Sequence, residues 1–542
     1  MDTVVRAYLR STDNTMTTLN SQQTTRSPAA LRWRVLGPLL GLALCCHGAD
    51  WPQIRGPHHD GVATDPINLQ WSGAVTNPVW LLPVPNSLCG FVVSGGRAFT
   101  QINRKINSAD KEVCVALNSA NGTELWATTL DDADYPDGFV GNDDGPRTTP
   151  TFNSGSVFVL TSYLKLYRLN ATNGAVIWQK DLVALYGGTV IRYQNAASPL
   201  IDDGLIYVNA NCASSSLMAL RTSDGSVAWR YQNEELTHST PVLTTLQGVR
   251  QVIFATGSGL VSLDPLTGGR LWRCNYPFTY NPLYSTAVSP VVHQDMVFMS
   301  GVCSDGYGSF VRQVTFTNNA WTSIQLWYLR DLGSAFTAPV ARDGFLYGPF
   351  GAEATLPLNQ LKCLDMRTGA VKWSQAGFGK GGLLIVGDYL MVLTEKCDLV
   401  LAQANPNAYV EVGRFTALPP YSSSNNKCWS VPAIADGKVY VRSTSFGAAY
   451  DFSPPGSSPL MLDPPWPSPG NQFELIVRTV NGSPIDSNRL AAMELRASTN
   501  LALSVLAWPK LTNLLLLTNG VARVLNVDGR PPHQYFIVRE PQ

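Results

Sequence analysis

One eleven-residue pattern recurs along this chain and limits its fold more than any other feature. It follows an apolar stretch, usually continues with Asn or Asp, turns on Gly and ends on a Trp four residues later. The five clear copies are Ala116–Trp126, Arg168–Trp178, Ala219–Trp229, Ser262–Trp272 and Cys363–Trp373. Asn and Asp side chains bond back to the backbone at turns, and Gly accepts the positive φ that such turns need. The pattern therefore predicts many copies of one β unit.

A second pattern precedes these copies. A Pro leads into an alternating strand, a tight turn containing Gly, and a second, more apolar strand. Examples are Pro150–Val159, Pro199–Val208, Pro339–Tyr347 and Pro432–Val441. Gly between two alternating runs is a strong hairpin signal. The two patterns together give four strands per unit, which is one blade of a β-propeller.

The units predict an all-β, eight-bladed propeller over residues 50–455. Its blades lie near residues 88–130, 147–182, 196–232, 238–276, 285–329, 335–375, 377–418 and 428–454. The eighth unit ends after its third strand, and Pro78–Pro83 resembles the Trp-bearing strand that it lacks. Residues 50–87 are therefore expected to form a strap and a ring-closing strand, which removes the open sheet edges.

Both ends of the chain differ from the repeats. Residues 1–49 have a basic stretch, an apolar run over Val35–Cys46 and small residues before Asp50, so we expect a leader and export to the periplasm, envelope or exterior. A short buried helix is the alternative. No apolar run reaches the roughly 18 residues that span a bilayer. Residues 456–470 are Pro-rich and predict a linker, and residues 471–542 predict a small β-sandwich-like module.

Charge and cysteine content narrow the function classes. The 39 basic residues balance 39 acidic ones, so the sequence shows no electrostatic footprint for nucleic acid. Eight cysteines follow the leader, and none forms a C-x-x-C pair, which argues against zinc. In an oxidising compartment some could pair, whereas others could be buried as small hydrophobic residues.

The Gly-to-Trp turn is similar to the tryptophan-docking motif of PQQ-like (quinoprotein-type) β-propellers, a family that includes quinoprotein alcohol dehydrogenases and BamB. The segments Trp51–Gly61 and Asp144–Pro150 resemble exported PQQ-like repeat proteins of planctomycetes, verrucomicrobia and their relatives. The resemblance covers roughly residues 50–455 and implies fold more than activity. It implies that the motif tryptophans pack between blades. They are Trp126, Trp178, Trp229, Trp272 and Trp373.

The dehydrogenases of this family imply PQQ with calcium, held by adjacent cysteines, carboxylates and amides. The only adjacent cysteines here are Cys45 and Cys46, inside the expected leader. We therefore expect no catalytic residue and no cofactor, with PQQ and calcium as the alternative. Asp143 and Asp144 belong to an acidic run that is a weak candidate for calcium, although a solvated turn explains it as well.

Propeller topology predicts where a ligand would bind. The innermost strand of each blade begins near the central channel, so the residues before these strands should ring one mouth of a funnel. This ring is Arg147, Asn195, His238, Tyr284, Phe336, Lys380 and Trp429. Two cations, a histidine, an amide and aromatic rings suit an anionic or planar ligand, although ordinary channel lining is the alternative. The long segment Gly348–Gln360, with Glu353, could overhang this mouth.

The sequence thus favours a non-catalytic, monomeric binding or scaffold module for an envelope protein or extracellular polysaccharide. The second hypothesis is a PQQ-dependent or related oxidoreductase with its site in the funnel.

Overall fold

The computed structural model confirms the all-β prediction. It describes residues 5–10, 50–68, 71, 76–135, 145–280, 286–303, 306–334, 336–351, 360–420, 426–454, 460–463, 466–468, 472–480, 484–485, 487–499, 508–528 and 533–539. Strands dominate these residues, and the described helices are α1 (Leu182–Tyr186) and α2 (Ser487–Ala492). Neither helix is long or apolar enough to cross a membrane. The chain divides into two compact units, residues 48–453 and residues 1–47 with 454–542.

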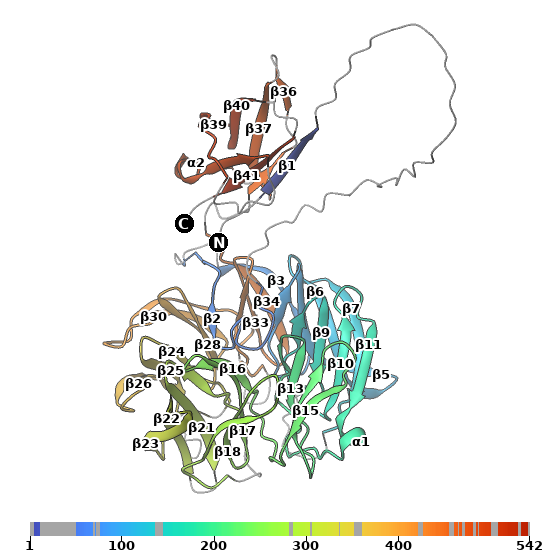
Figure 1. The fold of residues 1–542 in the computed structure, drawn as a ribbon, viewed down its shortest axis with the longest axis vertical. Coiled ribbons are helices and arrows are strands. Elements are labelled where there is room, and N and C mark those ends of the chain that lie inside the picture. Colours follow the sequence, from blue (N-terminus) through green and yellow to red (C-terminus); the bar gives the residue numbers. More distant parts are fainter. Residues whose placement is uncertain are drawn as a thin grey trace. The chain divides into compact units, whose positions relative to one another are not determined.

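The described part of the larger unit folds into eight sheets that follow one another along the chain (Figure 1). In chain order they are β4–β7 (Val92–Ser94, Arg97–Ile106, Ala109–Asn118, Glu124–Asp132), β8–β11 (Thr151–Asn153, Ser156–Leu160, Lys165–Asn170, Val176–Asp181), β12–β15 (Leu200–Asp202, Leu205–Asn209, Leu217–Arg221, Val227–Tyr231), β16–β19 (Val242–Leu246, Val249–Thr256, Gly259–Leu263, Arg270–Asn275), β20–β23 (Val291–His293, Met296–Cys303, Gly306–Thr317, Ala320–Leu329), β24–β27 (Val340–Arg342, Phe345–Phe350, Gln360–Asp365, Val371–Gln375), β28–β31 (Gly382–Val386, Tyr389–Leu393, Asp398–Gln403, Glu411–Thr416) and β32–β34 (Ala433–Ala435, Lys438–Arg442, Phe446–Asp451). Each is an antiparallel meander, as the paired hairpin and turn patterns predict.

The cores of this unit lie between neighbouring sheets. One cluster joins Phe99 and Cys114 of the first sheet to Val157, Val159 and Tyr167 of the second. The middle strands β9 and β18 are buried along their whole length. Each sheet is therefore covered on both faces by its neighbours, and the unit gains its hydrophobic stabilisation from sheet-on-sheet packing.

The N-terminal part of the larger unit completes its last sheets. β3 (Pro78–Pro83) pairs antiparallel with β34, with Trp80 opposite Ala449, and supplies the outer strand expected for the eighth repeat. β2 (Val62–Ala63) adds in parallel to β28. In Figure 1 the blue strand β3 accordingly lies beside the orange strands β33 and β34. Residues distant in sequence thus close the edge of the last sheet.

Six tryptophans join successive sheets through the same hydrogen bond. In each case the indole Nε1 donates to a backbone carbonyl in the third-to-fourth-strand turn of the next sheet. The pairs are Trp80 with Ser119, Trp126 with Ala171, Trp178 with Thr222, Trp229 with Pro265, Trp327 with Met366 and Trp373 with Asn405, at 2.8–3.1 Å. The turn glycine lies against the ring, and a Cβ on Gly174 would meet Trp126 at 2.6 Å. Glycine is therefore required at position 174, both because its φ is positive and because a Cβ would clash with the indole ring.

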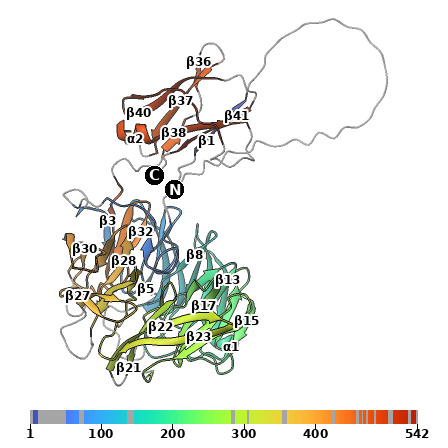
Figure 2. The same cartoon turned by 60° about the vertical axis from the view of Figure 1, so that its left-hand side comes forward.

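Trp272 departs from this scheme. Its Nε1 donates to Oε1 of Gln251 in its own sheet, at 2.5 Å. The next sheet has no docking turn, because β22 and β23 continue to a tight turn at Asn318 and Asn319, both at positive φ. Figure 2 shows β22 and β23 as long paired strands. Trp272 still packs between two sheets, in one core with Met299 and Phe310 of the next sheet, as its motif predicts. Only the hydrogen bond to a docking turn is missing, because that turn would belong to the following unit.

A tryptophan from the strap occupies the docking position that the seventh unit lacks. Gly413 of β31 stands at the position that Trp373 has one sheet earlier. Gly413 pairs with Leu401 and Trp373 pairs with Cys363, each beside a register shift. Trp71 packs against Gly413, and its ring centroid lies 5.0 Å from that of Phe452. The strap therefore restores an indole where the repeat has lost it.

Both outcomes foreseen for the cysteines occur. Cys397, in the turn between β29 and β30, forms a disulfide with Cys428, which precedes β32. This bond ties the last two repeats together across 31 residues. The remaining cysteines whose side chains are described are reduced and buried: Cys89, Cys114, Cys212, Cys274 and Cys363.

The smaller unit contains two further sheets. The first has the order β35 (Leu460–Leu462), β37 (Gln472–Thr479), β40 (Val521–Asp528) and β39 (Leu515–Thr518), with β36 (Trp466–Ser468) also paired to β37. The second is β1 (Val5–Arg10), β41 (His533–Arg539) and β38 (Glu494–Ser498). Phe473 and Phe536 from the two sheets pack in one core, with ring centroids 5.2 Å apart. Cleavage before Asp50 stays a prediction; it would remove β1.

Replacing Gly174 and Gly155 by alanine separates docking from backbone strain. Both glycines have φ near +74°, but a Cβ at Gly155 meets nothing within 4 Å. Gly155→Ala is expected to cost about 1–2 kcal/mol for the left-handed conformation alone. Gly174→Ala should cost about 1–3 kcal/mol more, because the methyl group displaces Trp126. Urea unfolding followed by circular dichroism measures both, and equal costs would contradict inter-sheet docking by Trp126.

Candidate functional site

Short hydroxyl side chains join the sheets where their innermost strands begin. The Gly90 amide donates to Oγ1 of Thr149, at 3.0 Å. The Thr149 amide donates in turn to Oγ of Ser198, and the Ser198 amide to Oγ1 of Thr240. These bonds fix the spacing of the first four sheets and satisfy backbone groups that the strand ladders leave over. They also define the wall of a central cavity.

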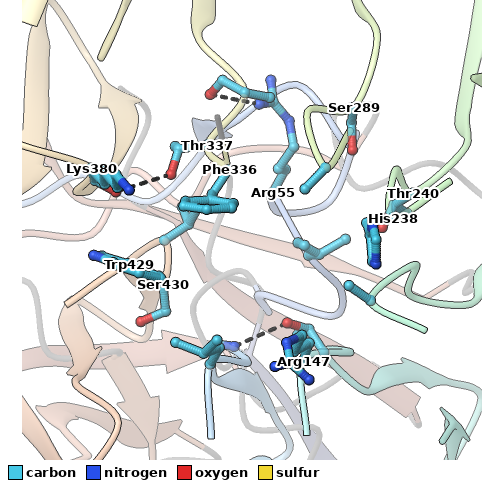
Figure 3. Close-up of a pocket in the computed structure, with 18 of the residues that line it drawn as sticks. Arg55, Arg147, His238, Thr240, Ser289, Phe336, Thr337, Lys380, Trp429 and Ser430 are labelled. Atoms are coloured by element: carbon cyan, nitrogen blue, oxygen red, sulfur yellow. Dashed lines mark hydrogen bonds between the residues drawn. The ribbon is translucent and has the colours of Figure 1, made fainter. Parts of the chain in front are cut away.

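This cavity has a volume of about 370 Å³ and is lined by the beginnings of the innermost strands (Figure 3). We call it the funnel. Its walls combine aromatic rings, hydroxyl groups and cations from several sheets. Among the described lining residues are Phe91, Arg147, Thr149, Tyr193, His238, Thr240, Ser289, Phe336, Lys380, Lys427, Trp429 and Ser430.

The strap forms the floor of the funnel. The Trp51 backbone pairs with Val93, and the Phe152 amide donates to the Pro52 carbonyl. The buried Arg55 donates to the carbonyls of Ala338 and Pro339, at 3.0 and 3.1 Å. Burial lowers the pKa of Arg55 to about 10, which leaves it charged at neutral pH. The strap thus connects the first, second and sixth sheets beneath the cavity.

A second cavity lies on the other side of this floor. It has a volume of about 390 Å³ and is lined by strap residues His58 and His59 together with Asp202 and His293. Arg55 lines both cavities. The strap therefore separates the two spaces, and the funnel has the form of a dead end rather than a through-channel.

Five of the seven residues in the predicted ring line the funnel: Arg147, His238, Phe336, Lys380 and Trp429. Asn195 does not. It is fully buried, donates to the carbonyls of Thr161 and Ala197, and accepts from the Ala197 amide. Tyr284, Glu353, Asp143 and Asp144 lie outside the described residues. The prediction missed Arg55 and Lys427, because neither sits at the start of an innermost strand.

One wall of the funnel is a stacked aromatic pair with two lysines beside it. The Phe336 and Trp429 rings lie 5.0 Å apart at an interplanar angle of 16°. Lys380 Nζ lies 5.0 and 5.1 Å from these two ring centroids, and Lys427 Nζ lies 5.6 Å from that of Trp429. The Trp429 indole donates to Oε1 of Glu395 at 2.8 Å, which fixes the plane of the stack.

The opposite wall carries a second cation–aromatic group. The Arg147 guanidinium lies 5.7 Å from the Tyr135 ring centroid, and the Tyr135 hydroxyl donates to the buried Glu112. Burial raises the pKa of Glu112 to about 7. His238 contacts the Arg192 carbonyl through Nε2 at 2.9 Å. Burial, with the charge of Arg147, lowers the pKa of His238 to about 4, so this imidazole is neutral at pH 7.

The funnel lining contains no carboxylate and no side-chain amide among the described residues. Calcium prefers several oxygen ligands of these types, and the hydroxyls of Thr149, Thr240 and Ser430 already bond to the backbone. The part of the chain that the structure describes also holds no cluster of three His, Cys, Asp or Glu that could bind a metal ion. The residues of this funnel thus do not fit a calcium-supported quinone.

The buried His238 should make the protein less stable in acid. Its pKa is about 4 in the folded chain and near 6.5 when unfolded, so between these values the unfolded chain binds the extra proton. Stability is therefore lost as pH falls from 6.5 to 4, by about 3 kcal/mol at most from this residue. His238→Gln should remove the part of the pH dependence of the unfolding free energy that comes from this residue. Urea midpoints of both proteins at pH 7 and pH 4.5 measure this. An unchanged slope would contradict a buried neutral His238.

Comparison with known proteins matches the repeat region. A family model described as outer membrane protein assembly factor BamB matches residues 109–375. BamB of Yersinia pestis is 28% identical over 159 residues, which are 29% of this chain and 36% of that protein. BamB of Moranella endobia (strain PCIT) is 25% identical over 278 residues, which are 48% of this chain and 62% of that protein. The chain thus spans less than two thirds of either relative.

Among solved structures, the quinohemoprotein alcohol dehydrogenase of Comamonas testosteroni is similar with a TM-score of 0.55 and 13% identity. The match covers 82% of this chain and 84% of that structure. At this identity the likeness shows the fold alone.

Proposed function

This chain is a PQQ-like β-propeller protein, and we propose that it is an exported, non-catalytic binding or scaffold module of the cell envelope, with eight blades around a ligand-binding funnel. The observation that carries the proposal is the dead-end funnel, whose walls set cations against aromatic rings. A closed floor suits retention of a ligand or of a chain end.

The chemistry of the walls favours an anionic guest with a planar or apolar body. Arg147, Lys380 and Lys427 supply positive charge, and the neutral His238 adds no further charge at pH 7. The face of the Phe336–Trp429 stack supplies apolar contact. Cation–π pairs at sites that keep contact with solvent are worth about 0.5–1 kcal/mol, which favours these lysine positions before a ligand arrives. A volume of about 370 Å³ lies within the usual range for small-molecule sites.

An envelope role is supported by the relatives. Both curated relatives carry the name outer membrane protein assembly factor, and the matched family has the same description. We therefore propose an exported protein, in the periplasm or at the envelope, that acts on a protein or polysaccharide partner and needs no cofactor. The expected leader over residues 1–49 fits this location.

The alternative is a PQQ-dependent or related oxidoreductase, which the fold of the Comamonas testosteroni enzyme suggests. The funnel argues against it, because its described lining offers no carboxylate or amide for calcium. Binding of an anionic ligand at the cationic wall requires neither a carboxylate nor an amide.

Ligand binding can be measured by thermal unfolding with 2-naphthoate, which is planar and anionic, and 2-naphthol as its neutral counterpart. A ligand that binds only the folded state raises stability by RT ln(1 + [L]/Kd). We expect 2-naphthoate to raise the Tm and 2-naphthol to have little effect. Lys380→Gln should weaken naphthoate binding about tenfold. Arg221→Gln, at the exposed end of β14 and not among the residues lining the funnel, should not change it.

Three outcomes would contradict this function. Equal effects of 2-naphthoate and 2-naphthol would remove the role of the cations. Equal binding by wild type and Lys380→Gln would place the ligand elsewhere. A concentration-dependent rise in Tm with PQQ that requires calcium would favour the oxidoreductase.

A further inference from the structure

The boundary between sheets β16–β19 and β20–β23 is built differently from its neighbours. At six other boundaries a docking turn covers the tryptophan of the preceding sheet, as Ala171 covers Trp126. Here the β22–β23 hairpin replaces that turn, and the Trp272 indole bonds within its own sheet. Trp272 is nonetheless buried against the next sheet, with Met299 and Val314, and the space outside it lacks a docking turn.

This space is a groove of about 680 Å³ between the outer strands β19 and β23. Its walls include the arginines Arg270, Arg273 and Arg312 and the rings of Tyr276 and Trp321. None of its described lining residues is Asp or Glu. The groove is thus cationic and aromatic, and we call it the rim groove.

Two of the three positive charges are not neutralised within the rim groove. Arg273 forms an ion pair with the buried Glu234, at 2.5 Å. The Arg312 guanidinium instead donates to Ser323 and Gln325, which are uncharged. Arg270 is exposed at the start of β19. Charge complementarity therefore requires an acidic occupant.

The backbone around the rim groove suits an extended segment. β19 and β23 are each the outermost strand of their sheets, so each presents an edge of backbone donors and acceptors. In β23, Trp321, Ser323 and Gln325 share the face that lines the groove, whereas Ile324 lies on the opposite face. At the tip of the hairpin, the Phe316 and Trp321 rings pack with centroids 4.8 Å apart. Strand addition uses such edges for affinity and alternating side chains for specificity.

We propose that the rim groove binds an extended acidic segment of a partner protein, with carboxylates at the arginines and alternate apolar side chains against Trp321 and Tyr276. This surface is separate from the funnel, and the proposal holds whether or not the funnel binds a ligand.

The test uses the full chain and a short fluorescein-labelled peptide that alternates glutamate with valine, with a lysine–valine peptide as control. Fluorescence anisotropy gives Kd. We expect binding of the glutamate peptide alone, weakened at least tenfold by Arg270→Gln with Arg312→Gln and weakened as salt rises. The matched control, Arg221→Gln with Arg97→Gln, removes two arginines outside the rim groove, one exposed and one half-buried, and should leave Kd unchanged.

A second groove variant and the Tm of each variant distinguish loss of binding from loss of folding. Ser323→Trp fills the rim groove without altering its charge and should also abolish binding, while an unchanged Tm shows that each variant is folded. Equal Kd values for both peptides, or for wild type and the folded groove variants, would overturn the proposal. Loss of peptide binding in Lys380→Gln but not in the groove variants would likewise overturn it, because the peptide would then occupy the funnel.

Discussion

The hydrogen bond from a tryptophan indole to the turn of the next sheet is the interaction on which the larger unit depends. It joins a large ring at the end of one repeat to the turn of the next, where a glycine usually leaves room for the ring, as with Trp126 and Gly174. The same bond recurs at six sheet boundaries with little change in length, so most sheets are set against their neighbours in the same way. The sheet faces then bury each other, which supplies most of the stabilisation.

The funnel follows from this repetition. Sheets held at similar spacing bring the starts of their innermost strands together. Amide-to-hydroxyl hydrogen bonds, such as that from the Thr149 amide to Ser198 Oγ, hold the wall in place. The N-terminal segment then adds what the repeats cannot provide. It gives β3 to the last sheet, Trp71 to the seventh unit and Arg55 to the floor. A wall of repeats and a floor of unique sequence together make a site that is closed on one side.

How well the sequence predicts the role of a residue depends on where in the chain the residues that it contacts lie. Repeated features, such as the Trp126 turn and the outer strand Pro78–Pro83, are visible because the chain repeats them. Trp272 packs between two sheets as predicted, but its indole bonds within its own sheet. That difference could not be predicted from its motif, because the partner turn belongs to the next unit, where Asn318 and Asn319 make a longer hairpin. Arg55 was not predicted as part of the funnel, because the strap has no periodicity. The rim groove is likewise visible only once β19 and β23 are placed side by side.

The N-terminal segment closes the ring of sheets, because β3 pairs with β34 and Trp80 bonds to the first sheet. Urea unfolding of two forms of the protein, one beginning at Asp50 and one at Val84, followed by circular dichroism and tryptophan fluorescence, measures what this closure contributes. The account predicts a cooperative transition for the longer form. For the shorter form, which lacks the strap and β3, it predicts a much lower midpoint or no cooperative transition. Equal midpoints for the two forms would contradict it.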